Sequence, residues 1–101
     1  MDLVNLERFE EAKSLLLKTI PLAQRVLGDG NDLTLRMRYC YAKALYKDPD
    51  ATLDDLREAV MTLEDTARIA RRVMGSANPL TRSIEKGLRN ARDALRAAEQ
   101  S

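Results

Sequence analysis

Residues 52–75 read TLDDLREAVMTLEDTARIARRVMG, and this stretch decides the fold. Its apolar side chains recur at spacings of three and four residues, which is the period of one face of an α-helix. They are Leu53, Leu56, Val60, Leu63, Ala67, Ala70 and Met74. Thr52 is a suitable N-cap with Asp55 three residues further on, and Gly75 is a natural terminator. The stretch therefore predicts an amphipathic helix that buries one face against other helices.

Three further helices are predicted around this one. Residues 5–27 form the first, which ends at Gly28, and residues 32–47 form the second. A loop follows, because the residue before Pro49 resists the helical conformation. The last helix starts at Asn78, an N-cap followed by Pro79 in the first turn, and continues to about residue 99. The expected core includes Cys40 and one side of the second helix, namely Leu33, Met37, Tyr41, Ala44 and Leu45.

The chain contains an internal repeat. When it is shifted by 47 residues, segment 6–46 aligns with segment 53–93, and thirteen of these 41 positions are identical. The identities cluster in the first helix against the third and at the turn that follows each of them. The repeated unit is therefore a pair of helices, and a period in the forties is typical of helical solenoids, in which stacked pairs share a continuous core.

Short motifs in both copies resemble a known family. The segment Phe9-Glu10-Glu11-Ala12 resembles the opening of the second helix in a tetratricopeptide repeat. The junctions at residues 25–34 (RVLGDGNDLT) and 72–81 (RVMGSANPLT) resemble those of kinesin-light-chain-like repeats. The resemblance implies an all-α, right-handed solenoid of antiparallel helix pairs in a single domain over residues 1–101. It assigns residues 5–28 to the second helix of one repeat, 32–75 to a full repeat, and 78–99 to the first helix of the next repeat or a cap.

The composition argues against catalysis and against metal or cofactor binding. The 101 residues include no His and a single Cys, which removes the usual general base and a zinc site of the Cys and His kind. No phosphate-binding or dinucleotide-binding glycine motif is present. The longest aliphatic run, at residues 15–17, is too short to span a membrane. The lone Cys40 favours a reducing compartment, so we expect a cytoplasmic, non-enzymatic protein with no cofactor.

A stripe of polar and aromatic side chains is the candidate binding site. The resemblance implies that the first helix of each pair lines a concave surface for a peptide or protein partner. The exposed positions of the second helix and the equivalent positions of the fourth supply Arg36, Tyr39, Lys43, Tyr46, Lys86 and Asn90. Cations and tyrosines in this arrangement suit an acidic extended peptide with an apolar anchor. An ordinary solvated face is the alternative interpretation of the same residues.

The first helix predicts self-association as a second possibility. It is apolar on two separate faces, and a helix of this kind is normally sandwiched between two neighbours. The second face carries Val4, Leu15, Leu22 and Val26. The outward positions of the fourth helix are polar, namely Arg82, Glu85, Arg89, Arg92 and Arg96. A symmetric homodimer through the first helix is therefore expected if this alternative holds.

Charge is arranged in blocks along a chain whose net charge is +1. Residues 48–65 carry seven acids and one base, and residues 66–101 carry eight bases and three acids. A basic surface for nucleic acid is one interpretation, and complementarity with the helix dipoles is the other. The absence of aromatic side chains among these arginines disfavours base stacking and hence nucleic acid as the partner.

Overall fold

The structure is a computed structural model that describes the backbone of residues 3–101 and the side chains of residues 8–101. It contains four α-helices, and no strand occurs in the described part of the chain. Their bounds are α1 Leu3–Leu27, α2 Asp32–Lys47, α3 Leu53–Met74 and α4 Pro79–Gln100. The predicted all-α class and the number of helices are confirmed. The predicted bounds differ from the observed ones by one or two residues at some ends.

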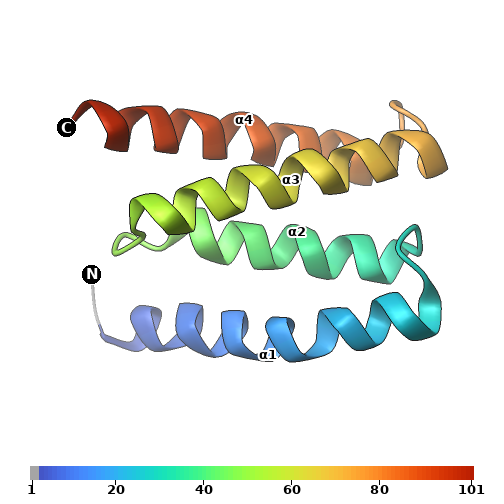
Figure 1. Cartoon of the computed structure of the whole chain (residues 1–101), viewed down its shortest axis with the longest axis horizontal. Coiled ribbons are helices and arrows are strands. Elements are labelled where there is room, and N and C mark those ends of the chain that lie inside the picture. Colours follow the sequence, from blue (N-terminus) through green and yellow to red (C-terminus); the bar gives the residue numbers. More distant parts are fainter. Residues whose placement is uncertain (1–2) are drawn as a thin grey trace.

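The helices follow one another in an antiparallel succession (Figure 1). Each helix packs against the next along the chain, and α2 also contacts α4. By contrast, the backbone of α1 approaches α2 alone among the described helices. The result is an elongated body of 37 × 27 × 20 Å, in which α2 contacts all three other helices and α1 lies at one edge.

The helix starts reproduce the internal repeat at the level of single hydrogen bonds. The Asn31 side chain accepts from the backbone N–H of Leu33 at 2.9 Å, and the Asn78 side chain accepts from that of Leu80 at the same distance. These two caps are 47 residues apart. The glycines that end the preceding helices, Gly28 and Gly75, both have positive φ, at 96° and 89°. The cap follows the terminating glycine by three residues in both turns, so both turns are fixed in the same way.

The cap of α3 is a reciprocal one. Thr52 Oγ1 accepts from the N–H of Asp55 at 3.1 Å, and the Asp55 carboxylate accepts from the N–H of Thr52 at 3.0 Å. We expect Thr52→Ala to lower the free energy of unfolding by about 1 kcal/mol, because an N–H at the helix start loses its partner. Urea denaturation followed by circular dichroism measures this loss. Thr52→Ser keeps the hydroxyl and should be close to neutral, so an equal loss in both variants would contradict a capping role.

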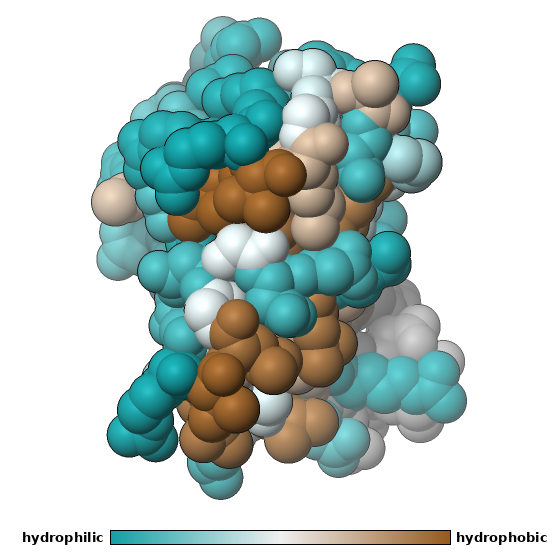
Figure 2. Space-filling model, turned by 90° about the vertical axis from the view of Figure 1, so that its right-hand side faces the viewer, coloured by the Kyte–Doolittle hydropathy of each residue, from teal (hydrophilic) through white to brown (hydrophobic). Residues whose placement is uncertain are grey.

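The two turns at 28–31 and 75–78 lie at the same end of the molecule, and exposed apolar side chains gather there (Figure 2). They include Val26, Leu27, Leu33 and Val73, which are between 44% and 69% exposed. A Cβ added at Gly30 would lie 3.0 Å from Cγ2 of Val73, so the first turn packs closely on the end of α3. This contact joins the two helix pairs at their turns.

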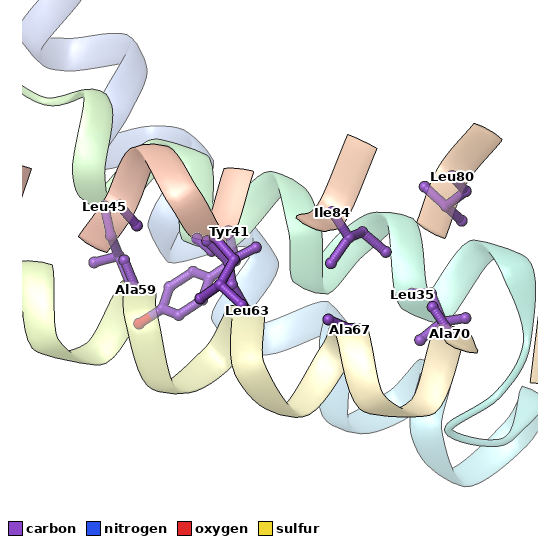
Figure 3. Close-up of a cluster of buried hydrophobic side chains, with 12 residues drawn as sticks. Leu35, Tyr41, Leu45, Ala59, Leu63, Ala67, Ala70, Leu80 and Ile84 are labelled. Carbon is purple, nitrogen blue, oxygen red and sulfur yellow. The ribbon is translucent and has the colours of Figure 1, made fainter. Parts of the chain in front are cut away.

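The core lies between α2, α3 and α4 (Figure 3). Leu35, Leu63 and Ile84, one from each of these helices, are fully buried. Leu16 and Ile20 of α1 pack against this cluster but keep part of their surface exposed. Polar contacts join the same helices: Arg38 of α2 pairs with Asp65 of α3 at 2.5 Å. The α1 helix therefore contributes less to the core than the other three.

Candidate protein-interaction surface

The exposed stripe of α2 forms its own side-chain contacts. Arg36 is exposed and pairs with Asp32 one turn earlier, at 2.6 Å between Nε and Oδ2. The Nζ atom of Lys43 lies 5.1 Å from the centre of the Tyr39 ring, within the range of a cation–π contact. Tyr39 and Lys43 are each half-buried. The stripe is thus an ordered surface, with the charge of Lys43 held over an aromatic face.

Two tyrosines connect this stripe to α4. Tyr39 packs against Gly87, where an added Cβ would lie 3.1 Å from Cε1 of the ring. Burial raises the pKa of Tyr39 and of Tyr46, and the nearby polar side chain of Asn90 partly offsets the rise in the pKa of Tyr46. Both phenols are therefore neutral near pH 7. They present an apolar body with a hydrogen-bonding tip between α2 and α4.

The structure brings most of the predicted binding residues together. Arg36 and Tyr39 line a hollow of about 310 Å³ between α2 and α4, whose other walls include Pro79, Leu80 and Ser83. The Asn90 side chain of α4 lies near the phenol of Tyr46. Lys86 is exposed on α4, four residues and hence about one helical turn before Asn90. The six predicted residues therefore occupy neighbouring parts of α2 and α4.

A larger hollow, between α1 and α2, was not predicted from the sequence. Its volume is about 630 Å³, and it is lined by Arg8, Phe9, Ala12, Cys40, Lys43, Ala44, Lys47 and Pro49. Three of these residues are cations, and the remaining lining is largely apolar. The prediction that Cys40 lies in the core is wrong, because its side chain is exposed in this hollow, whereas the adjacent Tyr41 is buried. Neighbouring residues on a helix point about 100° apart, so one of them faces α3 and the other does not.

The predicted self-association residues lie on the outside of α1. Leu15, Leu22 and Val26 are 65%, 51% and 69% exposed. The side chain of Val4, the fourth residue of this set, lies outside the described residues. In Figure 2 an apolar patch covers the lower part of the visible face, where α1 ends and α2 begins. An apolar surface is therefore present on α1, as expected for an unpaired helix face.

Other kinds of site find little support in the described residues. No group of three or more His, Cys, Asp or Glu side chains among them is arranged to hold a metal ion. None of the described helices is both long enough and apolar enough to cross a membrane. The strongly perturbed tyrosine is Tyr41, whose pKa is raised by burial and by its hydrogen bond to Glu58. That pair joins α2 to α3 and has a structural role.

Comparison with known proteins yields no relative. No family model matches the chain, and neither the curated proteins nor the solved structures contain a match. The function is therefore argued from the surfaces described above and from the motifs of the internal repeat.

Proposed function

We propose that this chain is a non-catalytic protein-interaction module of the tetratricopeptide kind. It binds an acidic, extended peptide segment of a partner protein along α2 and α4. The observation that carries the proposal is the joined surface of Arg36, Tyr39, Lys43, Tyr46 and Asn90, which runs beside a hollow between the two helices. A cytoplasmic location fits the lone, exposed Cys40.

The solenoid arrangement is part of this proposal. Two observations support it: α2 contacts α4 as well as its sequence neighbours, and the caps and terminators recur after 47 residues. Contact between alternate helices is what a stack of helix pairs requires, because the first helix of each pair then lies beside the first helix of the next. A shared surface of α2 and α4 follows from this packing.

The chemistry of the surface favours a carboxylate-bearing ligand. Arg36, Lys43 and Lys86 are donors without acceptor capacity, and charge-assisted hydrogen bonds to carboxylates are roughly twice as strong as neutral ones. Tyr39 and Tyr46 are already ordered by packing, so little side-chain entropy is lost when a ligand covers them. A peptide with an apolar residue between acidic ones would use both features.

Reversal of charge on this surface tests the proposal. The probe is a fluorescein-labelled synthetic peptide in which Glu residues flank a single Leu. We expect Arg36→Glu with Lys43→Glu to weaken its binding at least about tenfold, because each lost charged hydrogen bond contributes about 1.5 kcal/mol. Fluorescence anisotropy measures the affinity, and circular dichroism checks that helicity is unchanged.

The matched control is Arg57→Glu with Arg68→Glu. These two residues are also exposed and paired with a carboxylate on their own helix, but they lie on α3, outside the α2–α4 surface. The control changes the net charge of the protein by the same amount at a different place, so it should leave most of the affinity intact. Equal affinities in the two double variants, or no binding by the wild type, would contradict the proposal.

Nucleic acid receives less support as the partner. The four aromatic residues of the chain are Phe9 on α1 and Tyr39, Tyr41 and Tyr46 on α2. The outer arginines of α4 thus have no aromatic side chain on their own helix on which a base could stack. A salt titration distinguishes the two cases, because binding through phosphate contacts weakens steeply as the salt concentration rises.

A further inference from the structure

The exposed side of α1 carries a heptad-like seam. Positions 8, 12, 15, 19, 22 and 26 alternate in spacing between four and three, as the contact positions of a helix pair do. They are occupied by Arg8, Ala12, Leu15, Thr19, Leu22 and Val26. Leu15, Leu22 and Val26 are aliphatic and more than half exposed. We name these six residues the α1 seam.

The internal repeat shows what such a face normally contacts. A shift of 47 residues places Ala12 on Ala59 and Thr19 on Thr66. Ala59 and Thr66 are completely buried, and Ala59 lies beside Leu45 and Tyr41 of α2 in Figure 3. Their counterparts Ala12 and Thr19 remain partly exposed. The small residues of this face are thus buried in the second copy and partly open in the first, whereas Val73, the equivalent of Val26, is exposed in both.

Charge opposes one way of covering the α1 seam, namely contact between the seam and the outer side of α4 of another molecule. The outer side of α4 carries four arginines and one acid: Arg82, Glu85, Arg89, Arg92 and Arg96. The hollow beside the α1 seam is rimmed by the cations Arg8, Lys43 and Lys47. Head-to-tail stacking would bring these like charges together, which opposes the growth of an open filament.

The edge of the α1 seam is self-complementary when two copies run antiparallel. Glu11, Lys18 and Arg25 are exposed and follow one another at intervals of seven along one edge. In an antiparallel pair centred near residue 18, Leu15 of one copy faces Leu22 of the other. The same register places Glu11 beside Arg25 of the second copy, and the twofold axis repeats this pair. The two Lys18 side chains meet at the axis, so two attractive pairs flank one contact between like charges. A parallel pair places equal positions at equal heights, so Glu11 and Arg25 would not meet.

We propose that two copies of this chain form a homodimer through an antiparallel contact of their α1 seams about a twofold axis. Leu15 and Leu22 form its apolar centre, Val26 lies at each end of the contact, and two Glu11–Arg25 pairs set the register. This surface differs from the α2–α4 surface described above, and the two adjoin only at the hollow that Arg8 and Ala12 share with Lys43.

Sedimentation velocity on the full chain, over a range of micromolar concentrations, tests the dimer. We expect a concentration-dependent dimer for the wild type and a monomer for Leu15→Glu with Leu22→Glu. The control is Met61→Glu, because Met61 is 68% exposed on α3 and lies away from the α1 seam. A monomeric wild type at all concentrations, or an undiminished dimer in the double variant, would overturn the proposal.

Charge reversal tests the register without altering the apolar positions. Glu11→Arg and Arg25→Glu should each raise the dimer dissociation constant by about tenfold, since each breaks two ion pairs and creates repulsion. The combination of both changes should restore dimerisation to near the wild-type level. Failure of the combined variant to recover would exclude the antiparallel register. Because all four residues in these pairs are exposed, this arm remains decisive even if the double glutamate variant at Leu15 and Leu22 does not fold.

Discussion

Replacement of Leu63 with alanine is expected to lower the free energy of unfolding by about 2–5 kcal/mol. Leu63 is completely buried on α3, and its Cδ2 would lie 3.7 Å from a Cβ added at Gly87 of α4. Figure 3 shows it beside Tyr41 of α2. Its removal leaves a cavity where three helices meet, and rigid helices collapse into such a space only in part. Urea denaturation followed by circular dichroism measures the loss.

The repeat supplies a matched control for this change. Leu16 is the counterpart of Leu63 on α1, and it packs against the core with part of its surface exposed. Leu16→Ala should cost less than about 2 kcal/mol, because less apolar area is returned to water. Equal losses at the two positions would show that α1 is packed as tightly as α3, which contradicts the open face described for α1. The comparison also indicates whether the two copies of the internal repeat contribute equally to the stability of the fold.

The helices and their ends were predictable because local chemistry determines them. The reciprocal cap of Thr52 and Asp55, the Asn78 cap followed by Pro79 and the glycine at position 75 all occur where the sequence indicated. The stripe of α3 has one dominant face, and the buried residues Leu56, Leu63, Ala67 and Ala70 belong to it. A helix with a single apolar face leaves little freedom in how it is placed.

The orientation of α2 was predicted less well. Leu33 was expected in the core but is 48% exposed, whereas Leu35 and Ala42 are fully buried and were not predicted. The physical reason is that α2 contacts α1, α3 and α4 and therefore buries more than one face. A periodic pattern shows which residues share a face, but it does not show how many neighbours the helix has.

The candidate site was predicted as a set of residues but not as a set of contacts. The stripe of α2 was expected to face the ligand together with positions of the fourth helix, and no contact between the two helices was predicted there. The structure half-buries Tyr39 and Tyr46, and Tyr39 packs against Gly87 of α4. The hollow between α1 and α2 was not foreseen, because it depends on how far these two helices lie apart around Phe9 and Ala12. Such features arise from the distance between helices, and that distance is set by the size of the side chains at the crossing.

Gly87 sets this distance between α2 and α4. Its added Cβ would lie 3.1 Å from Cε1 of Tyr39, so even alanine requires a small movement of the ring. Alanine also gains about 1 kcal/mol of helix propensity over glycine, which offsets part of that cost. A leucine at position 87 does not fit while Tyr39 keeps its place. We therefore expect Gly87→Leu to destabilise the fold by about 1–3 kcal/mol through overpacking, measured by urea denaturation.

A second substitution shows whether the loss comes from this contact. Tyr39→Ala removes the ring that the new leucine would meet, so the double variant should recover part of the stability that Gly87→Leu loses. Arg89→Leu, on the exposed outer side of the same helix, controls for the effect of a leucine on α4 itself. Losses that simply add in the double variant would mean that Tyr39 and Gly87 do not share one packing space. In that case the close approach of α2 and α4, on which the proposed peptide surface depends, would have to rest on other residues.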